Sequence, residues 1–75
     1  MPNATYRTMP NLIATRTPFK HGSHSAYIDT DGRYRVWSYS TEIATAKGDE
    51  ITFNERKYSV TTSRLQNIIR KAWGI

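Results

Sequence analysis

Residues 25–39 read SAYIDTDGRYRVWSY, and this stretch carries the clearest structural signal in the sequence. Its Asp31-Gly32 pair suits a two-residue type I′ turn, in which both central residues take positive φ. Such a turn joins two antiparallel strands and places Tyr27 opposite Val36. Because side chains alternate along a strand, this register puts Tyr27, Tyr34 and Val36 on one face of the hairpin. The other face then carries Ala26, Ile28, Trp37 and Tyr39.

Turn signals continue at short intervals after the hairpin. Residues 43–46 (IATA) and 50–53 (EITF) predict two strands joined by a turn at 47–49 (KGD). A further turn at 54–56 leads into residues 57–60, which predict a short final strand. Regular spacing of this kind is typical of an antiparallel meander rather than of βαβ units.

The carboxy-terminal segment predicts a helix. Residues 63–74 read SRLQNIIRKAWG, with apolar residues at 65, 68, 69, 72 and 73, a period of about 3.6. Ser63 and Gln66 fit a capping box, and Gly74 follows the last apolar position, where helices tend to end. Because a helix of this length is marginal alone in water, we expect its apolar stripe to pack on the sheet.

The segment before the hairpin shows no hydrophobic periodicity. Residues 1–11 predict an amino-terminal arm or a weak edge segment, and residues 12–16 predict a short strand. Pro18 then interrupts regular pairing, because proline lacks a backbone N–H. The expected architecture is α+β: a small antiparallel meander of four to five strands packed against one carboxy-terminal helix. Residues 12–75 would form this single domain.

Length and composition exclude several classes of protein. A chain of 75 residues has room for one thin core, and the absence of cysteine excludes disulfides and cysteine-based zinc sites. No apolar run approaches the roughly 20 residues of a membrane span, and no secretory signal is recognised. We therefore expect no membrane association and a reducing compartment.

Catalytic and metal-binding motifs are missing. His21 and His24 supply at most half of a metal's usual ligands, and the Asp29–Gly32 segment lacks carboxylates at the ends of an EF-hand loop. The sequence contains neither a Gly-x-Ser-x-Gly nucleophile motif nor a glycine-rich phosphate loop. These observations predict a non-enzymatic protein without a metal or cofactor.

The net charge of +5 is unevenly distributed: residues 1–20 carry +3, residues 21–54 carry −2 and residues 55–75 carry +4, and Glu55 is the last acidic residue. On a helical wheel the polar side chains lie opposite or beside the apolar stripe. Arginine and lysine neutralise phosphates, and asparagine can bond to bases or sugars. The sequence therefore predicts a nucleic-acid or partner-binding surface made of Arg56, Lys57, Arg64, Asn67, Arg70 and Lys71. A structural interpretation is also open, because Arg70 and Lys71 would complement the helix dipole without any ligand.

Basic and aromatic residues also alternate along residues 33–39, RYRVWSY. Such a strand can form a stacking platform for single-stranded nucleic acid. However, Trp37 and Tyr39 fall on one face, as core residues would, and so few large apolar residues are present that the aromatic ones are needed in the core. We therefore favour core packing for this strand.

Four stretches together resemble a known family: RTPF (16–19), YRVWSYSTEIA (34–44), Asn54, and KYSVTTSRLQN (57–67). The sequence is similar over about residues 16–70 to a family of small uncharacterised proteins encoded by bacteriophages and their prophages. The resemblance implies a phage origin and a setting in the host cytoplasm, and it implies no established activity.

This resemblance favours a second functional hypothesis. Small phage proteins commonly bind a host protein and modulate or inhibit it. The same basic face would then meet an acidic patch on the host protein, or an open sheet edge would pair with it. An open edge can also pair two copies of the chain, so a homodimer is a further expectation.

Overall fold

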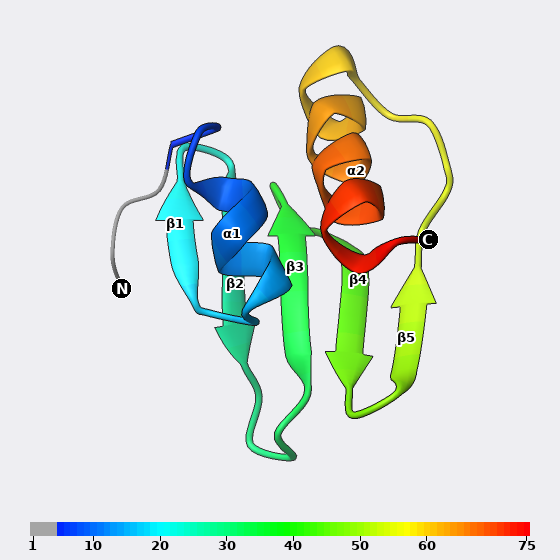
Figure 1. The fold of residues 1–75 in the computed structure, drawn as a ribbon. Coiled ribbons are helices and arrows are strands. Elements are labelled where there is room, and N and C mark those ends of the chain that lie inside the picture. Colours follow the sequence, from blue (N-terminus) through cyan, green and yellow to red (C-terminus); the bar gives the residue numbers. More distant parts are fainter. Residues whose placement is uncertain (1–4) are drawn as a thin grey trace.

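The computed structural model describes residues 5–75 as one five-stranded sheet with two helices on the same side of it (Figure 1). The strands occur in the sheet in chain order, and each is antiparallel to the next. The predicted α+β meander is therefore confirmed. The elements are α1 (Met9–Ala14), β1 (Phe19–His21), β2 (His24–Ile28), β3 (Tyr34–Ser38), β4 (Thr41–Lys47), β5 (Glu50–Phe53) and α2 (Val60–Trp73).

The helix α1 is a structural part of the domain. Pro10 lies in its first turn, where the missing N–H would have no helical partner in any case. Met9 and Ile13 are four residues apart, so they share one helix face, and both are fully buried. This short helix therefore contributes two side chains to the core.

The predictions for the amino-terminal third are wrong where the structure describes it. Residues 12–16 do not form a strand, and the domain boundary expected after residue 11 falls inside α1. The interpretation of residues 1–11 as an arm fails from Thr5 onward, because this segment turns into α1 and packs on the core. The rest of that prediction, residues 1–4, lies outside the described residues.

The predicted hairpin exists, but its register is offset by one residue. Ala26 pairs with Val36, and Ile28 pairs with Tyr34. Gly32 takes positive φ while Asp31 does not, so the turn is not type I′, and the loop extends over residues 29–33. A one-residue shift moves a strand's side chains to the opposite face. Ala26 therefore faces the core together with Val36, whereas Tyr27 faces away from it.

The strands after the hairpin agree with the sequence pattern until residue 53. The predicted strands at 43–46 and 50–53 are contained in β4 and β5, and Gly48 forms the turn between them with φ +59°. Residues 57–60 do not form a strand. Residues 57–59 lead from the sheet edge into α2, because Ser59 is the N-cap and Val60 is the first residue of the helix.

The cap of α2 differs from the predicted capping box. Ser59 is the N-cap, and its Oγ accepts a hydrogen bond from the backbone N–H of Thr62 at 3.2 Å. Gln66 instead donates from Nε2 to the backbone oxygens of Asn54 (2.8 Å) and Arg56 (2.9 Å). The glutamine therefore holds the loop between β5 and α2 against the helix. The predicted end is confirmed, since Gly74 closes α2 with φ +66°.

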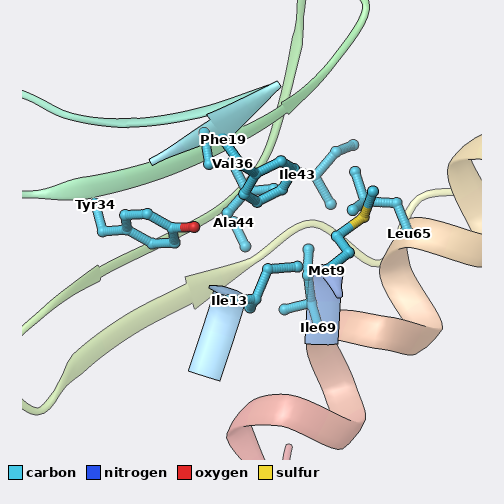
Figure 2. Packing of buried hydrophobic residues seen from close by; sticks show 10 residues of the cluster. Met9, Ile13, Phe19, Tyr34, Val36, Ile43, Ala44, Leu65 and Ile69 are labelled. Carbon is cyan, nitrogen blue, oxygen red and sulfur yellow. The ribbon is translucent and has the colours of Figure 1, made fainter. Parts of the chain in front are cut away.

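The core lies between the sheet and the two helices. Leu65 and Ile69 of α2 are fully buried beside Met9 and Ile13 of α1, which confirms that the apolar stripe of α2 packs inward (Figure 2). Trp73 donates a hydrogen bond from Nε1 to the backbone oxygen of Ile13 at 3.0 Å. The buried cluster is Met9, Ile13, Phe19, Ala26, Tyr34, Val36, Ile43, Ala44, Leu65 and Ile69.

Candidate functional site

The outer face of α2 is an exposed polar surface. Arg64, Asn67 and Lys71 are exposed and occur at positions i, i+3 and i+7, so they form one line along the helix. Val60, which is 89% exposed, continues this line at the beginning of the helix. Arg70 is exposed at the flank of the line. The opposite face of the helix is the one that carries Leu65 and Ile69 into the core.

Two of these cations lie over aromatic rings. The Cζ atom of Arg64 lies 4.5 Å from the ring centroid of Tyr6, and the Cζ atom of Arg70 lies 5.1 Å from that of Phe53. Such contacts attract the cation to the ring face and leave its charge available. Arg70 Nη2 also lies 3.9 Å from Glu55 Oε1, a long and exposed ion pair of the kind that contributes little. The aromatic rings therefore hold the side chains of Arg64 and Arg70 in place without neutralising their charge.

Arg56 and Lys57 lie in the loop that enters α2. Both are exposed, and the backbone N–H of Arg56 donates to Asn54 Oδ1 at 2.9 Å. The bond from Gln66 to the Arg56 carbonyl keeps this part of the loop beside the helix. The structure thus places all six predicted residues on the surface of α2 or of its preceding loop. It ties Arg56 to the helix directly, whereas Lys57 makes no such bond among the described residues.

Five of the six acidic residues lie in strands of the sheet or in the loops that join them. Arg35 donates from Nε to Asp29 and from Nη1 to Glu42, both at 2.8 Å. A hydrogen bond from the backbone N–H of Thr30 and the Arg35 guanidinium hold the pKa of Asp29 below its usual range. Arg33 lies 3.4 Å from Glu50. Since these carboxylates neutralise sheet arginines, they leave the helical side of the molecule with the excess positive charge.

Sequence reasoning missed one residue of this surface, Tyr6. Its ring supports Arg64 and makes an edge contact with His21 at 4.8 Å between centroids. The Tyr6 hydroxyl lies 3.2 Å from His24 Nε2. The segment before α1 has no periodic pattern, and these partners are distant in sequence. No sequence signal could therefore have indicated Tyr6.

The two histidines, His21 in β1 and His24 in β2, pair across these neighbouring strands. His24 is only 1% exposed, and its Nδ1 has no hydrogen-bond partner among the described residues. Within residues 5–75, no three histidine, cysteine or acidic side chains converge in a group that could hold a metal ion. The two histidine rings instead pack against the ring of Tyr6.

Acidification is expected to destabilise the fold through His24. Burial, and secondarily the charge of His21, lower the pKa of His24 below its ordinary value of about 6.5. The unfolded chain then binds a proton more readily than the folded one, so the free energy of unfolding is highest above pH 6.5 and falls as the pH drops toward the folded-state pKa. Urea unfolding between pH 8 and pH 5 measures this. His24→Gln should flatten the profile over that range, and an unchanged slope would contradict the assignment.

The fold and this surface define a class: a small α+β domain that covers one side of an antiparallel meander with two helices and exposes a basic helix face. Among the described residues, neither helix has the length and apolarity needed to cross a bilayer. The chain belongs to a family of unknown function, DUF8033, whose model matches residues 8–72. The match extends from the residue before α1 almost to the end of α2, so it includes the helix that the sequence did not predict. No curated protein and no solved structure matches the chain.

Proposed function

We propose that this protein is a non-enzymatic nucleic-acid-binding protein that uses the outer face of α2 and the loop before it. The observation that carries the proposal is the line of Arg64, Asn67 and Lys71, exposed on a helix that has no acidic residue. Phosphates attract such a face, because cations that bind them release condensed counterions. The asparagine between the two cations is suited to a base edge or a sugar.

The dimensions of the face suit a polyanion. Lys71 lies seven positions after Arg64, which corresponds to about 10 Å along the helix axis. Duplex DNA carries one phosphate per roughly 3.4 Å along each strand, so the two cations would bind different phosphates. Arg56 and Arg70 flank this line and would extend the contact to further phosphates.

We also propose a phage origin and a setting in the host cytoplasm. The support is the resemblance of residues 34–44 and 57–67 to small proteins encoded by bacteriophages and prophages. A cytoplasmic setting would give a basic protein direct access to both host and phage nucleic acid.

A salt titration tests the nucleic-acid proposal. Binding to labelled duplex DNA, single-stranded DNA and RNA is measured by fluorescence anisotropy at several salt concentrations. If four cations each neutralise one phosphate, log K should fall with log salt at a slope of about −3.6 for duplex DNA and about −2.8 for single strands. Failure to bind all three probes at low salt would refute the proposal.

A second candidate function is binding to a host protein with an acidic patch. The observation that favours it is apolar exposure beside the cations: Val60 is 89% exposed and Tyr58 is 44% exposed. Apolar contacts next to charges are typical of protein interfaces rather than of phosphate contacts.

The substitution Val60→Lys separates the two candidates. It adds a cation to the line of Arg64 and Lys71 and removes the exposed apolar group. Nucleic-acid affinity should then stay equal or rise, whereas capture of a host protein from nuclease-treated lysate should be lost. Retention of that host protein by the variant would exclude Val60 as part of a protein interface.

A further inference from the structure

The second face of the sheet is not covered by either helix. Both α1 and α2 lie on one side of the sheet, and the other side is open along β2, β3 and β4 within the described residues (Figure 1). The one-residue register offset places Tyr27 and Trp37 on this open side, opposite the buried Ala26 and Val36. The interpretation of Trp37 as a core residue is therefore wrong, although it follows from a plausible face assignment.

Tyr27 and Trp37 form a flat aromatic pair on this open face. Their rings stack at 6.3 Å between centroids with an interplanar angle of 9°. Tyr27 remains 37% exposed, and the Trp37 indole Nε1–H is shielded from solvent without a hydrogen-bond partner among residues 5–75. Tyrosine and tryptophan are enriched among the few residues that contribute most of the binding energy at protein interfaces. The exposed ring of Tyr27, stacked on Trp37, therefore offers apolar area that contact with another protein would bury.

The charges around this aromatic pair balance. The Arg35 guanidinium lies between Asp29 and Glu42, and Arg33 pairs with Asp31 at 4.0 Å and with Glu50 at 3.4 Å, so four carboxylates lie near this face. The register also places Lys20 and Lys47 on this side, where both are exposed at the margins of the sheet. The carboxylates on this face would repel a polyanion. A basic partner would gain little from these carboxylates, because they already pair with arginines. The open face therefore fits a surface of no net charge.

We propose that the open face of the sheet is the contact surface between two copies of this chain. A second copy presents the same charge-balanced surface, whereas the helical side of a chain with net charge +5 repels its own copy. An isologous two-fold contact would bring the Tyr27–Trp37 pair of one copy against the same pair of the second copy. The basic faces of α2 would then point outward on opposite sides of the dimer.

Two measurements over a range of protein concentrations test this proposal: the mass of the species in solution and the NMR resonance of the Trp37 indole N–H. Sedimentation equilibrium should show a species of twice the 8.7 kDa of one chain that dissociates on dilution. The chain has two tryptophans, so the spectrum of indole N–H groups contains its own control. The Trp37 resonance should shift with protein concentration. The Trp73 resonance should not, because that N–H is bonded to the Ile13 carbonyl. A monomer at every concentration, with a stationary Trp37 resonance, would overturn the proposal.

A pair of matched variants locates the contact. Tyr27→Lys places a charge in the centre of the open face and should shift the mass to that of a monomer. Tyr58→Lys changes a tyrosine of similar exposure, 44%, on the loop before α2, and should leave the dimer intact. Circular dichroism checks that each variant folds. If Tyr27→Lys does not fold, the concentration dependence of the Trp37 resonance in the unmodified protein tests whether the open face is the dimer contact. Three results would contradict a second copy as the occupant of this face. In the first, both variants dissociate the dimer equally, and in the second, Tyr27→Lys still dimerises. In the third, the protein is a monomer and an oligonucleotide shifts the Trp37 resonance.

Discussion

Replacing Ile69 with alanine is expected to lower the free energy of unfolding by about 2–5 kcal/mol. Ile69 is fully buried on the inner face of α2, in the same cluster as Met9, Ile13 and Leu65 (Figure 2). The substitution removes apolar contacts and leaves a cavity between the two helices. Native domains are stable by only about 5–15 kcal/mol, and small ones bury less surface and lie toward the lower end. A large fraction of the variant should therefore be unfolded at physiological temperature.

Val60→Ala is the matched control in the same helix. Val60 is 89% exposed, so its truncation should change the free energy of unfolding by less than about 0.5 kcal/mol. Urea unfolding followed by circular dichroism measures both variants. Equal stability of the two variants would mean that Ile69 does not hold α2 against α1 and the sheet.

The predictability of this fold follows the length of each local pattern. The helix α2 carries five apolar residues in register, and β4 and β5 are bounded by a clear Lys-Gly-Asp turn. Patterns of this length predict the type of an element correctly whatever contacts it makes with the rest of the chain. By contrast, α1 is six residues long, and its pattern consists of little more than Met9 and Ile13. Its stability comes from contacts with α2 and the sheet, which no local pattern records.

The hairpin shows why an element can be predicted while its faces are not. The Asp-Gly pair correctly indicates a turn between residues 28 and 34, but the number of loop residues decides the register. Both faces of the hairpin carry aromatic residues, so the alternation of hydrophobic residues cannot show which register is correct. Only the pairing of Ala26 with Val36 shows that Tyr34 is buried and that Trp37 lies on the open face.

The surface of α2 was accessible to sequence reasoning because a helical wheel depends on one element alone. Arg64, Asn67, Arg70 and Lys71 are all exposed in the structure. What depends on the fold could not be predicted: the Tyr6 ring beneath Arg64, and the pairing of the acidic residues with arginines on the sheet. The second of these features is what separates a basic helical side from a neutral sheet face.

Neutralising Arg64 and Lys71 together is expected to weaken nucleic-acid binding far more than the change in net charge alone would. In the proposed complex each cation binds one phosphate. Each such contact adds about 0.9 to the steepness with which log K falls against log salt, so at 0.1 M salt it contributes about 0.9 log units of affinity relative to 1 M salt. The variant Arg64→Gln/Lys71→Gln should therefore bind roughly 60-fold more weakly at 0.1 M salt, and its salt slope should be less steep by about 1.8. Fluorescence anisotropy with duplex DNA measures both quantities.

The control for this experiment removes the same amount of charge from the other side of the molecule. Lys20 and Lys47 are exposed and lie on the sheet rather than on α2, so Lys20→Gln/Lys47→Gln lowers the net charge equally. If binding depended only on overall charge, both double variants would lose affinity to the same extent. If the line on α2 makes the contacts, the Lys20/Lys47 variant should keep a slope close to that of the unmodified protein, because long-range attraction is screened within about 10 Å at this salt concentration. Equal slopes for the two variants would therefore argue against α2 as the binding surface, whatever the affinity of the unmodified protein.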